Sequence, residues 1–127
     1  MTVLVDTSVW VDHFRRRNEA LVNLLGRDLV LIHPMVLLEL ACGTPPAPRT
    51  QTLGDMGLLM AAEQATLDEV MQFVEREKLY GLGCGLVDMA LLASTLVTPG
   101  AKLWTLDRRL GDLSDRFGVA HQPVASH

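Results

Sequence analysis

The sequence has little of what several classes of protein require. Two cysteines among 127 residues, Cys42 and Cys84, are too few for a disulfide framework, and we expect both to be reduced and buried. Aromatic residues make up only 5% of the chain, which disfavours a platform on which single-stranded bases stack. The net charge is −4, from 15 acidic and 11 basic residues, so bulk positive charge does not hold a nucleic acid here.

Membrane insertion and secretion also find no support in the sequence. The apolar stretch at residues 79–101 contains Asp88, several glycines and Pro99, which excludes a membrane span. The first six residues have neither the basic region nor the long apolar region of a signal peptide. We therefore expect a cytoplasmic protein.

The length and a hydrophobic content of 49% predict one domain over residues 1–127, with a buried core and a frayed tail from about Gln122. Short apolar, β-branched runs predict strands at residues 2–5, 29–32, 102–105 and, at an edge, 117–120. Periodicity and end signals predict helices at residues 9–14, 19–25, 35–42, 52–62, 66–78, 86–97 and 108–115. This alternation predicts an α/β fold with a mainly parallel central sheet flanked by helices. In such sheets, ligands bind beyond the carboxyl ends of the strands.

Four acidic residues stand in unusual positions. Asp6 and Asp107 each follow a predicted strand, so we expect them at the carboxyl edge of the sheet. Glu39 and Asp88 are each the only charged residue within a long apolar run. Buried acids are nearly always paired with a cation or bound to a metal. We expect all four carboxylates to reach one pocket above the sheet.

Each of these acids also has a purely structural interpretation. Asp6 and Asp107 precede helices, where Asp is a favoured N-cap. Glu39 could pair with a buried arginine or with His33, and Asp88 could interact with the dipole of its helix. The apolar runs contain no Lys or Arg that would neutralise the acids, however, and converging carboxylates repel one another. A divalent cation removes this repulsion, and a site with only oxygen ligands suits Mg²⁺ or Mn²⁺.

The motifs that contain these acids resemble those of the PIN-domain family, and specifically of VapC-type toxin ribonucleases. The matching segments are residues 3–10, 36–40, 83–93 and 103–107, and the resemblance extends from residue 2 to about residue 120. It implies an Mg²⁺- or Mn²⁺-dependent endoribonuclease that acts on RNA, forms a homodimer and is inhibited by a cognate VapB-type antitoxin. It also implies that Asp6, Glu39, Asp88 and Asp107 are the catalytic and metal-binding acids.

Three further residues are candidates for supporting roles. Ser8 could support Asp6, and Thr105 matches a polar residue that the family often has two positions before its last acid. Arg108 follows a predicted site strand and could contact phosphate. The chain departs from the family at Arg109, where a second acid or Asn is frequent, so Asp6 and Asp88 are the firmest metal ligands.

The chemistry of this interpretation is hydrolysis by a metal-activated water. A metal ion held by Asp6 and Asp88 would orient and deprotonate the water, while Glu39 and Asp107 position it or complete a second metal site. Without these four acids, the acidic residues number 11 and equal the 11 bases, so the rest of the protein is neutral.

Two other functions share some of these features. A phosphoacceptor receiver domain has a similar length, fold and Mg²⁺ site, but it requires two adjacent early acids and a lysine at the end of a late strand. This chain has neither, because Lys102 begins its predicted strand. A catalytically inactive PIN-like scaffold that binds RNA or a partner would not need the complete acidic set.

A partner surface is expected between residues 43 and 62. The loop at residues 43–49 and the Leu- and Met-rich run at residues 53–60 offer more apolar surface than one helix face buries. Packing of this helix on the sheet is the alternative. An antitoxin or a second copy of the chain is the expected partner.

Overall fold

A small parallel sheet organises the structure. The computed structural model describes residues 1–123. Within these residues, four strands form one sheet: β1 (Thr2–Val5), β2 (Val30–Ile32), β3 (Met60–Ala61) and β4 (Ala101–Trp104). Their order is β3-β2-β1-β4, and all neighbouring strands are parallel. The predicted α/β class with a parallel central sheet is confirmed.

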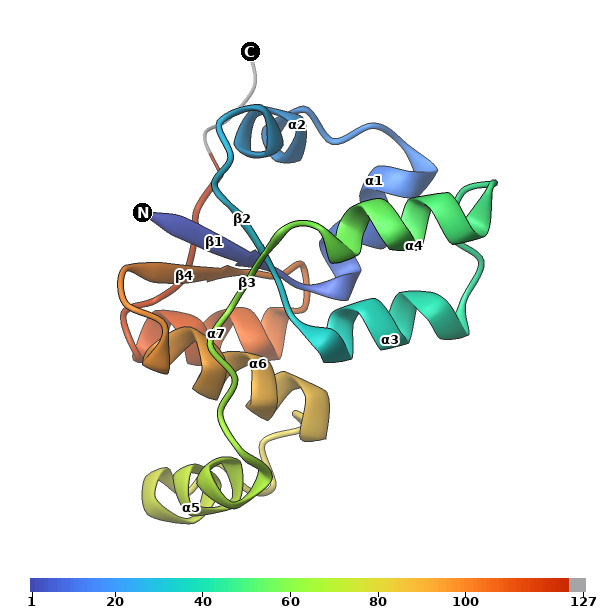
Figure 1. Cartoon of the computed structure of the whole chain (residues 1–127). Coiled ribbons are helices and arrows are strands. Elements are labelled where there is room, and N and C mark those ends of the chain that lie inside the picture. Colours follow the sequence, from blue (N-terminus) through green and yellow to red (C-terminus); the bar gives the residue numbers. More distant parts are fainter. Residues whose placement is uncertain (124–127) are drawn as a thin grey trace.

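Helices flank the sheet on both sides. Over the same residues they are α1 (Thr7–Arg15), α2 (Glu19–Gly26), α3 (Pro34–Cys42), α4 (Arg49–Gly57), α5 (Leu67–Glu77), α6 (Leu86–Val97) and α7 (Arg108–Arg116). Figure 1 shows α2 on one side of the sheet, α6 and α7 on the other, and α5 beyond α6. Helices α1, α3 and α7 begin just after the carboxyl ends of β1, β2 and β4, which places their first turns at one edge of the sheet.

Strand β1 lies at the centre of the core. Its residues Val3, Leu4 and Val5 are completely buried, because the strand has a neighbour on each side and helices above and below. Leu91 and Leu92 of α6 are also completely buried against this layer. A strand covered on both faces reads as a continuous apolar run, which is why β1 was predictable.

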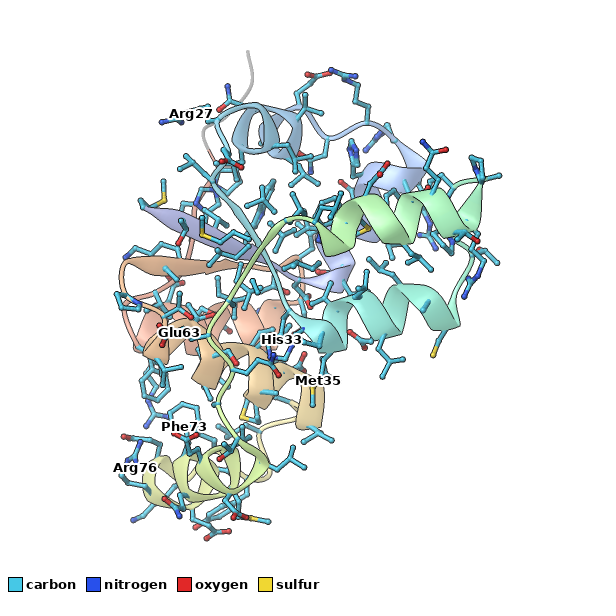
Figure 2. The ribbon with its side chains drawn as sticks, viewed as in Figure 1. Arg27, His33, Met35, Glu63, Phe73 and Arg76 are labelled. Carbon is cyan, nitrogen blue, oxygen red and sulfur yellow. The ribbon has the colours of Figure 1, made fainter. Side chains whose placement is uncertain are left out.

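A buried histidine joins two helices that carry acidic residues. His33 is the N-cap of α3; its Nδ1 accepts a hydrogen bond from the backbone N–H of Met35 at 3.0 Å, and its Nε2 lies 3.2 Å from Ser94 Oγ on α6. Figure 2 shows His33 at the start of α3. Burial lowers the pKa of His33, which favours the neutral imidazole that can accept at Nδ1. This contact fixes the start of α3, which carries Glu39, relative to α6, which carries Asp88.

The helix predicted over residues 52–62 is wrong at its end. Helix α4 ends at Gly57, and Met60–Ala61 form the edge strand β3 beside β2. Gly54 and Gly57 weaken the helix. Both residues of β3 are exposed, so this strand has no alternating pattern by which the sequence could reveal it.

Other expectations have mixed outcomes. The edge strand predicted at residues 117–120 is reduced to one parallel bridge between Ala120 and Leu103 in the described chain. The prediction of buried thiols is wrong: Cys42, the last residue of α3, is exposed, and Cys84 in the glycine-rich turn is half-buried. The prediction of a frayed tail from about Gln122 concerns mainly residues 124–127, which lie outside the described residues. None of the helices in residues 1–123 is both long and apolar enough to cross a membrane.

Candidate active site

The four acids lie in one region at the carboxyl edge of the sheet. Asp6 follows β1, Asp107 immediately precedes α7, Asp88 is in the first turn of α6, and Glu39 lies in α3. Burial raises the pKa of Asp88, and the charges of Asp6, Asp107 and Glu39 raise it further, against a lowering hydrogen bond from Gly85. The fields of all three other carboxylates therefore reach Asp88.

Asp6 is held from one side by two hydroxyl groups. Its side chain is 6% exposed, and its Oδ2 accepts hydrogen bonds from Ser8 Oγ and Thr105 Oγ1, both at 2.7 Å. Asp6 occupies the N-cap position of α1 but makes no side-chain capping bond. Among the described residues, no hydrogen bond reaches its second oxygen, Oδ1. Asp6 therefore presents one oriented, unused carboxylate oxygen.

The same two hydroxyls link the ends of β1 and β4. Ser8 Oγ accepts a hydrogen bond from the backbone N–H of Leu106 at 3.0 Å, and Thr105 Oγ1 accepts one from the N–H of Asp107 at 3.0 Å. Each hydroxyl thus donates to Asp6 and accepts from the segment that leads into α7. The sequence did not reveal the role of the Leu106 backbone, because a backbone N–H carries no residue signature.

Asp107 behaves as a helix cap. It is exposed, and its Oδ1 accepts a hydrogen bond from the backbone N–H of Leu110 at 2.9 Å. The capping interpretation therefore holds for Asp107, whereas it fails for Asp6. Capping occupies one of its two carboxylate oxygens and leaves Oδ2 available for a water or an ion.

Glu39 differs from its expected environment. We expected a charge enclosed by apolar neighbours, but Glu39 is exposed, because the face of α3 that carries it lies at the open edge of the site. Its partner is neither an arginine nor His33: Thr7 Oγ1 donates a hydrogen bond of 2.6 Å to Glu39 Oε1. Sequence reasoning missed Thr7, although its position directly after Asp6 was an available signal.

Asp88 is half-buried at the start of α6. Its Oδ2 accepts a hydrogen bond from the backbone N–H of Gly85 at 3.3 Å. The described residues contain two ion pairs, Arg17–Glu19 and Arg76–Glu77, and neither includes a site acid. Arg108 is exposed at the first position of α7. The negative charge of the four acids is therefore not neutralised by a paired Lys or Arg in this part of the chain.

The donor set fits a hard divalent cation. Within residues 1–123, no three His, Cys, Asp or Glu side chains lie close enough together to share an ion. Mg²⁺ commonly keeps several waters and uses only one or two protein carboxylates, so it does not need such a cluster. The unused Oδ1 of Asp6 is an oxygen donor of the kind that such a cation binds, and a cation would offset the repulsion that raises the pKa of Asp88.

Comparisons with known proteins bear on the family to which the chain belongs. The family model described as PIN domain matches residues 3–115. The chain is 43% identical over 118 residues to Ribonuclease VapC32 of Mycobacterium tuberculosis, in strains CDC 1551 / Oshkosh and ATCC 25618 / H37Rv. That match covers 93% of this chain and 94% of the relative in each case.

The raised pKa of Asp88 predicts that its ionised carboxylate destabilises the metal-free protein. We expect Asp88→Asn to melt at the same or a higher temperature than the wild type at pH 7 in chelator, because it removes a desolvated charge. A group whose folded pKa is raised costs stability above its unfolded pKa, so the advantage should shrink as the pH falls towards about 4. Calorimetric melting across this pH range measures the effect. Asp112→Asn, on the exposed side of α7, is the control, and a large loss of stability in Asp88→Asn would show a structural role instead.

Proposed function

The chain belongs to the PIN-domain family, and we propose that it is a metal-dependent endoribonuclease that acts as the toxin of a VapBC-like toxin–antitoxin pair. The main support is the unused, oriented oxygen of Asp6 beside three further carboxylates at the carboxyl edge of the sheet. The 43% identity to a VapC ribonuclease over 93% of the chain supports RNA as the substrate.

In the proposed reaction, Asp6 and Asp88 would hold Mg²⁺ or Mn²⁺. When bound, the cation supplies the charge that activates a water and offsets the negative charge of the phosphodiester. Glu39, oriented by Thr7, accepts a hydrogen bond from the attacking water, and Asp107 completes the site with the oxygen that does not cap α7. Ser8 and Thr105 act through Asp6, because they orient its carboxylate. Hydrolysis by water needs no 2′-hydroxyl, so the preference for RNA rests on the relatives.

Cleavage of RNA in the presence and absence of metal tests this proposal. We expect a mixed-sequence single-stranded RNA to be cut in Mn²⁺ and to stay intact when EDTA is in excess. Loss of a residue that only supports a metal ligand typically lowers activity about 10–100-fold. Asp6 and Asp88 are the proposed ligands themselves, so Asp6→Asn and Asp88→Asn should each lower the rate of cleavage ~100-fold or more. Glu39→Gln should also lose most activity. Asp107→Asn should keep part of the cleavage activity, because Asn caps a helix as well as Asp does and α7 would therefore begin in the same place.

The controls separate the proposal from its alternatives. Asp112→Asn should cut RNA as the wild type does. Cleavage that persists in EDTA, or in the Asp6→Asn/Asp88→Asn double variant, would contradict the metal mechanism. Uptake of phosphate from a small phosphodonor would indicate a receiver domain, and RNA binding without cleavage would indicate an inactive scaffold.

The proposed homodimer has a candidate surface on α3, α5 and α6. Leu86, at the start of α6, is 62% exposed and lines two adjoining hollows, one with Leu38 of α3 and the other with Met71 and Tyr80. These three neighbours are also exposed. Apolar residues that adjoin on a surface in this way mark interaction sites more often than scattered ones. The expected partner surface at residues 53–60 is less continuous: Leu58 and Met60 are exposed, but Met56 is buried, and Leu53 and Leu59 are half-buried.

Light scattering can decide between these two surfaces. We expect the isolated wild-type chain to be a dimer and Leu86→Asp to shift it to a monomer, because the new charge would have to be buried at the interface. Leu58→Asp, a matched change on the other surface, should remain dimeric. A strict monomer in the wild type, or dissociation caused by Leu58→Asp alone, would contradict the assignment.

The proposed VapB-type antitoxin has a candidate site beside Glu39. A cavity of about 450 Å³ lies between α1, α3 and the loop at residues 43–46, and Thr7 and Glu39 are in its wall. Val11, Phe14 and Leu40 give it an apolar lining, and Arg15 lies at its edge. A peptide bound there would contact Glu39 directly, which would account for inhibition of the enzyme by this partner.

A further inference from the structure

The side chain of Arg109 contacts Gly83, a glycine in the turn that precedes α6. A Cβ atom placed on Gly83 would come within 2.4 Å of Arg109 Nη1 and 2.8 Å of its Cζ, so any other residue at this position would require the guanidinium to move from its place. Gly83 also has a φ of +84°, a conformation that favours glycine. Because Gly83 has no side chain, the turn at residues 81–85 leaves a space that is occupied by the guanidinium of Arg109, the second residue of α7.

The charge of Arg109 is not neutralised by a carboxylate in the described chain. Its one hydrogen bond there runs from Nη1 to the carbonyl oxygen of Gly83 at 3.5 Å, the limit of such a bond, and neither of the two ion pairs includes it. A guanidinium has five N–H donors in a rigid plane, so four remain unused. The residue is exposed, and these donors are accessible to a ligand.

This cation lies beside the acidic region. Burial raises the pKa of the Cys84 thiol in the same turn; the nearby charges of Asp88 and Asp107 raise it further, and the positive charge of Arg109 lowers it. Asp88 follows the turn by three residues, and Asp107 begins the helix that carries Arg109. The guanidinium is therefore held at the rim of the acidic region without pairing with it.

We infer that Arg109 is a substrate-binding residue that contacts a phosphate of the RNA next to the one being cleaved. A planar guanidinium matches the oxygens of a phosphate, which it can bind through two parallel hydrogen bonds. Because four carboxylates repel an anionic chain, a fixed cation at the rim offsets that repulsion where the RNA enters. The turn orients the guanidinium in advance, so less side-chain freedom is lost on binding. The inference rests on the proposed function for the identity of the ligand.

Binding of a labelled RNA tests this inference directly. The probe is a short, fluorescein-labelled single-stranded RNA of mixed sequence, measured by fluorescence anisotropy with Ca²⁺ in place of Mn²⁺, and a gel verifies that it stays intact. We expect Arg109→Ala to weaken binding about tenfold, the effect of losing one charge-assisted hydrogen bond. The slope of log affinity against log salt concentration should fall by about 0.7, the value for one phosphate contact on a single strand. Arg116→Ala is the control, since Arg116 lies on the same helix and contacts the carbonyl of Glu77, also at 3.5 Å.

Variants of the turn distinguish the loss of the Gly83–Arg109 contact from the effect of backbone strain. Gly83→Ala should displace Arg109 and weaken binding as much as Arg109→Ala does. In the Arg109→Ala background it should add less than twofold, because both changes remove the same contact. Gly81→Ala is the matched control: its φ is +74°, but a Cβ there meets nothing within 4 Å, so it carries similar strain without the collision.

The outcomes distinguish this inference from the proposed function. Cleavage in Mn²⁺ should show a raised KM and a kcat within twofold of the wild type for Arg109→Ala. Binding by Arg109→Ala equal to that of Arg116→Ala, or a fall in kcat with unchanged affinity, would overturn the inference while RNA cleavage by the wild type stands. A wild type that cuts no RNA but loses affinity on Arg109→Ala would refute the nuclease and keep the phosphate contact.

Discussion

The arrangement of the site depends on the two hydroxyl groups that hold one oxygen of Asp6. Asp6 directly follows β1, whose last three residues are completely buried, and Ser8 and Thr105 reach its Oδ2 from α1 and from the segment after β4. Because the same hydroxyls accept from the backbone of Leu106 and Asp107, they tie the ends of two neighbouring strands together. The parallel sheet thus brings carboxylates to one edge, and hydroxyl groups rather than cations orient the central one.

The four acids are not equivalent, because each has a different second task. One oxygen of Asp107 caps α7, and Thr7 orients Glu39. Asp88 is half-buried; burial raises its pKa, and the charges of the other three acids raise it further. Within the described chain each acid keeps one carboxylate oxygen free of hydrogen bonds, but Asp6 is the one that is buried and held by two hydroxyl groups. For the proposed metal site, we expect these differences to rank the acids as ligands: Asp6 and Asp88 first, then Glu39, and Asp107 last.

The sequence predicted β1, β2 and β4 and the element beside or on which each acid lies, because buried parallel strands form continuous apolar runs. It could not predict β3, whose two exposed residues form no pattern, or the exposure of Glu39, which depends on the packing of α1 beside α3. The capping role of Asp107 and the free oxygen of Asp6 were both compatible with the sequence. Only side-chain geometry separates them.

The central claim is that Asp6 presents its free oxygen to a divalent cation. Calorimetric titration of the metal-free protein with Mn²⁺ tests it without reference to any substrate. The wild type should bind Mn²⁺, and a hundredfold excess over Kd should stabilise the fold by ~2.7 kcal/mol, which appears as a raised melting temperature. Asp6→Asn should lose both the heat of binding and the shift in melting temperature, whereas Asp112→Asn should keep both. Equal Mn²⁺ affinity in the wild type and in Asp6→Asn would contradict the account.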